Sequence, residues 1–238
     1  MRTVAVVLAG GTGQRFGGGR PKQLHTLAGK TIIEHSVAAF HQAAGVDAIM
    51  VVMPAGLAGQ AREMFTGGGY PKVTHVIEGG TARTDSTRCA IAALGDEECD
   101  VLFHDAARPL LDQRIIADCL RALATDRAIG VAVPSSDTIV EVSDGVVTGM
   151  PRRDALARCQ TPQGFRLSLI RRAYQLADAD PGFAQRPATD DCGIVLRYLP
   201  EVAVRIVPGS ERNIKITYPG DLALAETLLR AGEPGQPA

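Results

Sequence analysis

Short apolar runs alternate with segments of helical periodicity over the first half of the chain. Each apolar run ends at a small, polar or proline position, which is typical of a strand covered on both faces. Between the runs, apolar residues recur at three- and four-residue spacings, as in helices with one buried stripe. The predicted strands are residues 3–10, 47–54, 72–79, 100–106 and 128–134, and the predicted helices are residues 30–45, 56–65, 82–95 and 111–125.

This alternation predicts an α/β fold in which a mostly parallel sheet lies between two helical layers, a Rossmann-like three-layer sandwich. In such sheets, ligands bind at the carboxyl ends of the strands. The residues directly after each strand are therefore the candidates for chemistry.

The pattern changes after Pro134. Two alternating segments, residues 138–142 and 146–150, flank Ser143-Asp144-Gly145, which is a hairpin signature and excludes a helical crossover. We expect an arm over about residues 135–160 that leaves the main sheet. Helices at 167–177 and 190–199, a strand at 202–209 and a closing helix at 219–230 complete one domain over residues 1–230. The Gly/Pro-rich residues 231–238 are expected to form a flexible tail.

The overall composition narrows the function classes. Lys and Arg number 25 against 26 for Asp and Glu, so no global field recruits nucleic acid or a membrane surface. No apolar stretch reaches the length of a membrane span. The cysteines are odd in number and lack metal-site spacing, so we expect free thiols and a cytoplasmic protein; they are Cys89, Cys99, Cys119, Cys159 and Cys192.

A glycine-rich stretch, LAGGTGQRFGGGRPK, follows the first predicted strand. The dinucleotide fingerprint is disfavoured because Phe16 stands where its third glycine would be. A Walker A loop is excluded because Leu24 stands where its first glycine would be. The remaining interpretations are a loop whose amides wrap a triphosphate, with Arg15 and Lys22 adding charge, and a flexible turn with solvated cations.

Four further stretches lie at the predicted ligand edge or in the arm: EGGTARTDS, FHDAARPLL, RCQTPQGF and ERNIKITYPGDLALAE. Together with LAGGTGQR and PKQ, they resemble, in uninterrupted order from about residue 4 to 229, the CTP-dependent polyol-phosphate cytidylyltransferases, which act on 2-C-methyl-D-erythritol 4-phosphate or ribitol 5-phosphate. The resemblance implies a Rossmann-like nucleotidyltransferase domain and a homodimer in which the arm of each subunit embraces its neighbour.

The same resemblance implies attack by a substrate phosphate oxygen on the α-phosphorus of CTP, with release of pyrophosphate. Arg15 and Lys22 would stabilise the transition state at the α-phosphate, and Arg153 and Lys215 would complete the catalytic set. Amides of the glycine-rich loop would hold the triphosphate, the EGGT segment and the following helix would read the cytosine, and a small residue after Asp105 would leave room for the nucleotide. These nucleotide-binding residues are Leu8, Ala9, Gly10, Gly11, Thr12, Gly13, Gly80, Thr81, Ser86 and Ala106.

The second substrate would be bound by Asp105, Arg108, Thr138 and Thr161. Asp105 would also hold Mg²⁺, a hard cation that prefers carboxylate and phosphate oxygens. The alternative for this segment is a buried Asp-Arg ion pair with a purely structural role. His104 is assigned to packing or strand-end hydrogen bonding. In the arm, Arg153 and the adjacent Arg152 both remain candidates for the arginine that reaches the site.

The motifs disagree on the polyol. HDAARP is more like the methylerythritol phosphate enzymes, whereas LAGGTG and DTIVEV are more like the ribitol phosphate enzymes. We expect transfer of CMP to 2-C-methyl-D-erythritol 4-phosphate, a step toward isoprenoid precursors; the alternative is CDP-ribitol synthesis for cell-wall polymers. Two other classes are disfavoured. A non-catalytic nucleotide-binding protein would not need cations on both sides of the α-phosphate, and an NAD-dependent oxidoreductase would need the third glycine that this sequence lacks.

Overall fold

The computed structural model describes residues 1–11, 16, 21–67 and 69–232. Its centre is a seven-stranded sheet in the order β11-β7-β10-β6-β1-β4-β5. All neighbouring pairs are parallel except those made by β10, which runs antiparallel to β6 and β7. The strands are β1 (Thr3–Leu8), β4 (Ala48–Met53), β5 (Val73–Glu78), β6 (Asp100–Asp105), β7 (Ala128–Pro134), β10 (Ala157–Arg166) and β11 (Arg205–Pro208).

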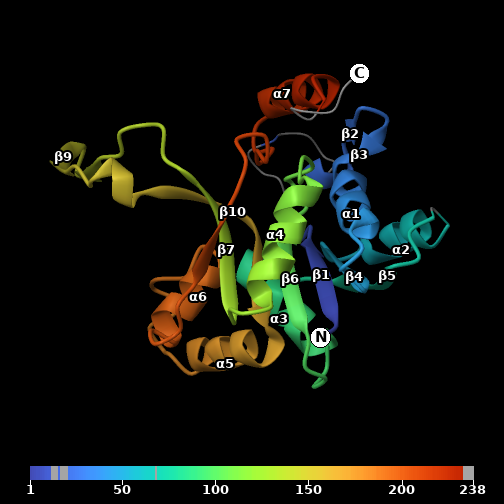
Figure 1. Cartoon of the computed structure of the whole chain (residues 1–238), viewed down its shortest axis with the longest axis horizontal. Helices are drawn as coiled ribbons and strands as arrows, with labels where there is room; N and C mark the ends of the chain where they lie inside the picture. The colour runs from blue at the N-terminus through green and yellow to red at the C-terminus, as the bar shows by residue number, and fades with distance from the viewer. Residues whose placement is uncertain (12–15, 17–20, 68, 233–238) are drawn as a thin grey trace.

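Helices cover both faces of this sheet (Figure 1). On one face, α1 (Ile32–Gln42), α2 (Ala58–Thr66) and α4 (Gln113–Leu123) bury apolar residues against alternate positions of β1 such as Ala5 and Val7. On the other face, α3 (Arg83–Ala93), α5 (Leu167–Asp178) and α6 (Asp191–Tyr198) pack on the intervening positions, Val4 and Val6. The predicted three-layer α/β architecture is confirmed.

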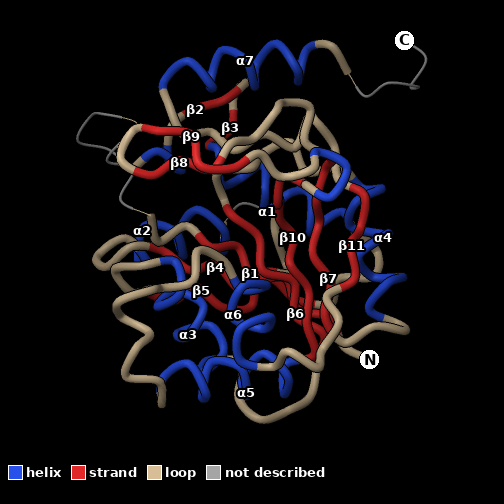
Figure 2. The backbone as a smooth tube through the Cα atoms, turned by 90° about the vertical axis from the view of Figure 1, so that its left-hand side faces the viewer, coloured by secondary structure: helices blue, strands red, loops and turns tan. Residues whose placement is uncertain are grey.

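A third apolar cluster lies beyond the carboxyl edge of the sheet. It joins Phe16 of the glycine-rich stretch to Ile216 and to Ala225 of α7 (Pro219–Arg230). Leu27 of the short hairpin made by β2 (Thr26–Leu27) and β3 (Lys30–Thr31) belongs to the same cluster. Figure 2 shows α7 beside this hairpin. The C-terminal helix therefore packs against the side of the domain that carries the glycine-rich stretch.

Strand β10 is the main element that the apolar pattern does not predict. Its sequence contains Pro162, which lacks an N–H, and Gly164, and both residues weaken a strand interior. In the structure, the register of β10 against β7 shifts between Cys159 and Gln163, so Pro162 falls in an irregular stretch. A Cβ at Gly164 would lie 2.8 Å from side-chain atoms of Ile129 and Leu102, so the glycine lets this central strand pass between its neighbours.

The predicted arm is a hairpin that projects from the body (Figure 1). Its strands are shorter than expected: β8 spans Glu141–Ser143 and β9 spans Val146–Gly149. Residues 138–140 lie outside the strand because the pairing with β9 begins only at Glu141.

Among the described residues, no helix is both long and apolar enough to cross a membrane. Most of the expected tail, residues 233–238, lies outside the described part of the chain.

Candidate functional site

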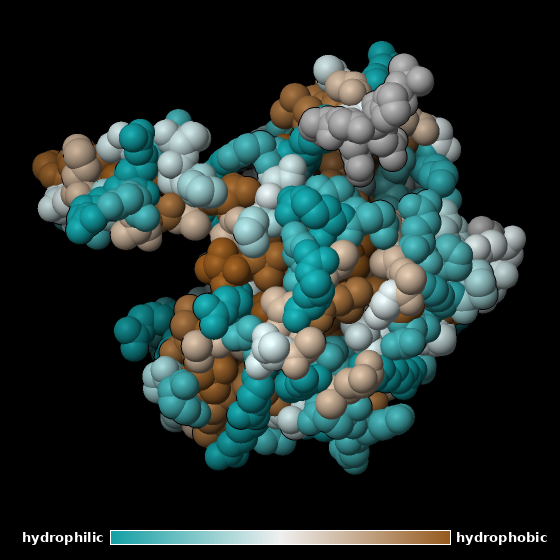
Figure 3. Space-filling model, in the orientation of Figure 1, coloured by the Kyte–Doolittle hydropathy of each residue, from teal (hydrophilic) through white to brown (hydrophobic). Residues whose placement is uncertain are grey.

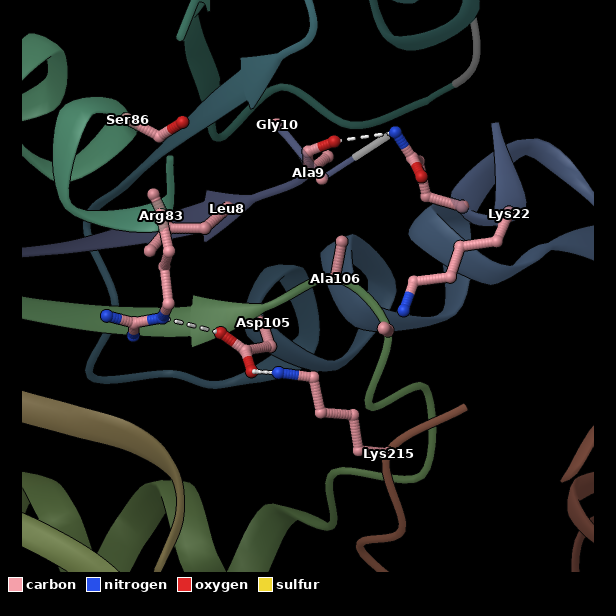
Figure 4. A pocket seen from close by; sticks show the side chains of 12 residues that line it. Leu8, Ala9, Gly10, Lys22, Arg83, Ser86, Asp105, Ala106 and Lys215 are labelled. Atoms are coloured by element: carbon pink, nitrogen blue, oxygen red, sulfur yellow. Dashed lines mark hydrogen bonds and ion pairs between the residues drawn. The ribbon is translucent and has the colours of Figure 1, made fainter. Parts of the chain in front are cut away.

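The site lies at the topological switch point of the sheet, where the strand order reverses. The chain runs from β1 outward to β4 and β5, and then returns to β6 on the other side of β1. Clefts at such switch points bind ligands in doubly wound sheets. A cavity of about 120 Å³ opens here (Figure 4). It is lined by Leu8, Ala9, Gly10, Gly11, Lys22, Gln23, Arg83, Ser86, Asp105, Ala106, Ala107 and Lys215.

Two glycines allow this cavity to close around Ser86. A Cβ at either Gly10 or Gly79 would lie 2.4 Å from the Ser86 Oγ, closer than real carbon contacts. The hydroxyl is buried and has no hydrogen-bond partner among the described residues. A buried hydroxyl without a partner is costly, so this wall is suited to a polar ligand that would bond to it. Ser86 is one of the residues predicted to contact the nucleotide.

Asp105 is held between two cations. Its Oδ1 accepts from the Arg83 Nε at 3.0 Å, and its Oδ2 accepts from the Lys215 Nζ at 2.7 Å. Figure 4 shows these side chains approaching the carboxylate from different elements. Burial would raise the pKa of Asp105, but the charges of Arg83 and Lys215 hold this pKa well below its usual range. The carboxylate is therefore ionised at any working pH.

Arg83 was not among the predicted site residues. Its Nη1 also donates to the Oδ2 of Asp191 at 2.7 Å, and the Asp191 carboxylate, which is fully buried, accepts from the Tyr174 hydroxyl at 2.7 Å. Burial alone would lower the pKa of Arg83, but Asp191 and Asp105 raise it. The buried chain Tyr174–Asp191–Arg83–Asp105 thus connects the far helical layer to the site.

One feature of the sequence could have indicated this buried network of side chains. Asp190 caps α6 by accepting from the Gly193 N–H at 2.8 Å, so a single aspartate satisfies the helix start. The adjacent Asp191 is a second carboxylate with no capping bond to make. Its burial requires a cation.

A second cavity of about 200 Å³ lies on the other side of Asp105. Arg83, Asp105 and Lys215 line both cavities, so the same charged wall separates them. The remaining lining residues are Arg108, Cys159, Gln160, Thr161, Gln163, Thr189 and Asp190. Two adjacent cavities with a shared charged wall are suited to two substrates that must react with each other.

Arg108 points into the second cavity without pairing to Asp105. Its guanidinium donates to the carbonyl oxygens of Asn213, at 2.7 Å, and Cys159, at 3.3 Å. The Asp105–Arg108 ion pair that was the structural alternative in the sequence analysis does not form, because Arg83 and Lys215 pair with Asp105 instead.

Lys22 lies at the end of the glycine-rich stretch. Its Nζ donates to the carbonyl oxygen of Ile216 at 2.9 Å and so connects this stretch to the segment that carries Lys215.

Several predicted residues do not join this group. Gly80 and Thr81 are absent from the lining of both cavities, although a Cβ at Gly80 would lie 2.2 Å from that of Asp85, so the turn before α3 needs glycine there. Thr138 and Arg153 are exposed on the arm and line neither cavity. Arg152 pairs with Asp154, with 3.1 Å between Nε and Oδ1. Thr12, Gly13 and Arg15 lie outside the described residues.

Asp105 is the carboxylate that lines both cavities and could bind a divalent cation. No cluster of three or more His, Cys, Asp and Glu side chains exists in the described parts of the chain, so a site made of protein ligands alone is not formed there. Mg²⁺ is commonly bound by one or two carboxylates together with substrate phosphates. Asp105 fits that mode, because each carboxylate oxygen can accept more than one contact.

A doubly wound sheet with a glycine-rich sequence after its first strand, and two cavities that share a charged wall, is the arrangement expected of a nucleotidyltransferase-type α/β domain. The chain belongs to the family described as IspD: 2-C-methyl-D-erythritol 4-phosphate cytidylyltransferase, whose model matches residues 3–231. The sequence-based assignment to a cytidylyltransferase is confirmed.

The chain is similar to the 2-C-methyl-D-erythritol 4-phosphate cytidylyltransferase of Thermobifida fusca (strain YX), with 52% identity over 97% of this chain and 94% of the relative. It is also similar to a bifunctional ribulose 5-phosphate reductase/CDP-ribitol pyrophosphorylase, Bcs1, of Haemophilus influenzae, with 39% identity over 97% of this chain and 48% of the relative. Among solved structures, 4-diphosphocytidyl-2C-methyl-D-erythritol synthase from Anaerococcus prevotii DSM 20548 superposes with a TM-score of 0.82 at 25% identity, covering 96% of each chain.

Proposed function

We propose that this protein transfers CMP from CTP to 2-C-methyl-D-erythritol 4-phosphate, giving the CDP-alcohol and pyrophosphate in isoprenoid precursor synthesis. The observation that carries the proposal is the pair of cavities that share Arg83, Asp105 and Lys215. CTP would occupy the cavity beside the glycine-rich stretch, and the polyol phosphate would occupy the cavity beside Arg108. The 52% identity to a relative named for this activity supports the choice of polyol.

In this reaction a phosphate oxygen of the polyol forms a new bond to the α-phosphorus of CTP, and the bond from that phosphorus to the bridging β-phosphate oxygen breaks. The electron pair leaves with pyrophosphate. Both reactants are anions, so the protein must hold them together and stabilise charge on the α-phosphoryl oxygens. Lys22 and Lys215 lie in the nucleotide cavity for this role, and Arg108 lies where it would bind the incoming phosphate.

Ribitol 5-phosphate is not favoured as the substrate, because the relative with the higher identity is named for methylerythritol phosphate. The test is pyrophosphate release measured with CTP and Mg²⁺ against methylerythritol 4-phosphate, ribitol 5-phosphate and glycerol 3-phosphate in parallel. We expect the highest kcat/KM with methylerythritol 4-phosphate. Faster turnover of ribitol 5-phosphate would reassign the substrate, and binding of CTP without any release would identify a nucleotide-binding protein that has lost the chemistry.

We further propose that Mg²⁺ enters with the phosphates of CTP and that Asp105 is its protein ligand. The bound ion would neutralise charge on the triphosphate. Removing divalent cations with a chelator should abolish pyrophosphate release, and added Mg²⁺ should restore it. Release at an unchanged rate in the chelator would contradict this assignment.

The arm supports the proposal of a homodimer. Both of its strands carry large apolar side chains that face solvent in the single subunit, with exposures of 59% at Val142, 64% at Val146 and 57% at Val147. Figure 3 shows apolar surface at the tip of the projecting arm. An exposed apolar patch of this kind marks a contact surface. Covering it with a second copy would also bring Thr138 and Arg153 toward the neighbouring site.

A mixing experiment tests whether the arm acts across the interface. Arg153→Ala and Lys215→Ala should each be inactive alone. If Arg153 serves the partner's site, a mixed dimer of the two variants contains one intact site, and random exchange should restore about a quarter of the wild-type activity. A parallel mixture with Arg152→Ala decides between the adjacent arginines. No recovery in either mixture would confine the arm to dimer contacts.

We also place the protein in the cytoplasm. All five cysteines are free thiols, and the absence of disulfides fits a reducing compartment.

A further inference from the structure

His104 is the penultimate residue of β6 and is fully buried directly behind the site. Its ring packs edge-to-face with that of Phe40, with 5.4 Å between ring centroids. The Nε2 lies 3.0 Å from the carbonyl oxygen of Arg108, and the Nδ1 lies 2.9 Å from the Oγ1 of Thr161. Both ring nitrogens are therefore engaged by residues of the second cavity.

These contacts define the position of each proton. A carbonyl oxygen only accepts, so the Nε2 of His104 must carry the hydrogen and donate to Arg108. The ring is fully buried, and its two nitrogens bond to a carbonyl oxygen and a hydroxyl and not to a carboxylate, so the imidazole is neutral and its Nδ1 has only a lone pair to offer. The Thr161 hydroxyl must then donate its single proton to that Nδ1.

Two backbone hydrogen bonds close the network. The Asp105 N–H donates to the Thr161 Oγ1 at 3.1 Å, and the Arg108 N–H donates to the carbonyl oxygen of Asp105 at 2.9 Å. The network thus forms a ring that runs from Asp105 to Thr161, His104 and Arg108 and back to Asp105. It holds three residues that line the second cavity, and His104 itself is not exposed to it.

We propose that His104 is a positioning residue that fixes the turn of residues 105–108 and turns the proton of the Thr161 hydroxyl away from the substrate. The inference rests on the proposed cytidylyl transfer for its kinetic consequences. The Thr161 hydroxyl donates its hydrogen bond to His104 and accepts one from the Asp105 N–H. It therefore has a single lone pair left to accept a hydrogen bond from a ligand in the cavity. A phosphate oxygen cannot bond to a lone pair, whereas a hydroxyl of the polyol can donate to it. Thr161 therefore recognises a polyol hydroxyl, and the phosphate is left to the cations.

The proton arrangement can be measured without any activity. In ¹⁵N NMR spectra of the full chain, the His104 signals are assigned by their loss in His104→Asn. We expect a bare, pyridine-like Nδ1 and a protonated, pyrrole-like Nε2. A protonated Nδ1 would overturn the inference. Because this readout needs no substrate, its failure is separate from a failure of the proposed function, which pyrophosphate release reports.

Two conservative variants separate the two side-chain bonds. His104→Asn can place an oxygen near the position of Nδ1 and keeps the acceptor for Thr161 but loses the donor to Arg108. His104→Gln can place its amide nitrogen near Nε2 and keeps that donor but loses the acceptor. Each should raise the KM for the polyol phosphate by about 2- to 10-fold, the size of one hydrogen bond, with the KM for CTP nearly unchanged. His75→Asn, at an exposed histidine on β5, is the matched control and should change neither constant.

The Thr161 contribution is tested in both backgrounds. Thr161→Val should raise the KM for the polyol phosphate in the wild type but add little in His104→Gln, because the hydroxyl is already misdirected there. Simple addition of the two effects, or equal changes in the KM values of both substrates, would overturn the proposal. If the His104 variants do not fold, the His104 signals in the wild-type ¹⁵N spectrum are assigned by elimination, from variants that each remove one of the other four histidines, His25, His35, His41 and His75.

Discussion

Asp191→Asn removes the charge that anchors Arg83, and its effect can be sized from the geometry. Asp191 is fully buried at the start of α6, its Oδ2 lies 2.7 Å from the Arg83 Nη1, and its other oxygen accepts from Tyr174. Removing one partner of a buried ion pair typically costs 3–5 kcal/mol. Arg83 keeps Asp105 and its side chain is 20% exposed, so we expect the lower end, about 3 kcal/mol. For a chain of this size, that lowers Tm by roughly 6–12 °C.

The measurement is equilibrium unfolding in urea, followed by far-UV circular dichroism because the chain has no Trp. Protein concentration is held fixed, since dimerisation would shift apparent stability. The matched control is Asp178→Asn, whose partner Arg88 also lies at 2.7 Å but whose side chain is 53% exposed. That change should cost less than about 1 kcal/mol. Equal losses in the two variants would refute the view that burial makes the Arg83–Asp191 pair a major contributor to stability.

Three further outcomes are expected. Lys215→Met should lower kcat by about 10²-fold or more, with a smaller effect on the KM for CTP, if the ammonium stabilises the transition state; steady-state pyrophosphate release measures the split. The pKa of His104 is about 4 in the folded chain against 6.5 unfolded, so the unfolded state binds more protons between these values. Stability should therefore fall by about 3 kcal/mol as pH drops from 6.5 to 4, and urea titrations of His104→Asn, which lacks this group, should show a flatter profile over that window. In the proposed homodimer, Val147→Asp should shift the mass measured by light scattering from dimer to monomer, and an unchanged dimer mass would exclude the arm tip from the interface.

The strands with continuous apolar runs could be predicted because burial on both faces leaves a direct mark on the sequence. β10 could not, since its central position depends on Gly164 fitting between two neighbouring side chains and on a register shift that accommodates Pro162. Neither feature is apolar or periodic. The parts of the site at strand ends, such as Asp105 at the carboxyl end of β6, were indicated by the rule that ligands bind at carboxyl edges.

The roles of Arg83 and His104 in the site could not be predicted from the sequence alone. In the sequence, Arg83 is one of two arginines in a polar helix, and nothing nearby requires it to be buried. Its partner Asp191 is 108 residues away, and only the packing of α6 against the sheet brings them together. His104 sits in a strand end with no metal-site partner, so packing and strand-end hydrogen bonding were the expected roles. Both were found, and they involve two residues of the second cavity, Arg108 and Thr161.

The two cations on Asp105 are not equivalent, and this difference bears on the proposed reaction. Arg83 also pairs with a second, buried carboxylate. If Arg83 moved away, the Asp191 carboxylate would be left buried without its cation, which is costly. The side chain of Lys215 is 40% exposed, and Asp105 is the partner of its ammonium in the described structure. When a triphosphate adds negative charge to the first cavity, Lys215 can turn to it at little cost while Arg83 continues to neutralise Asp105. The exchangeable contact is therefore Asp105–Lys215, and the fixed one is Asp105–Arg83.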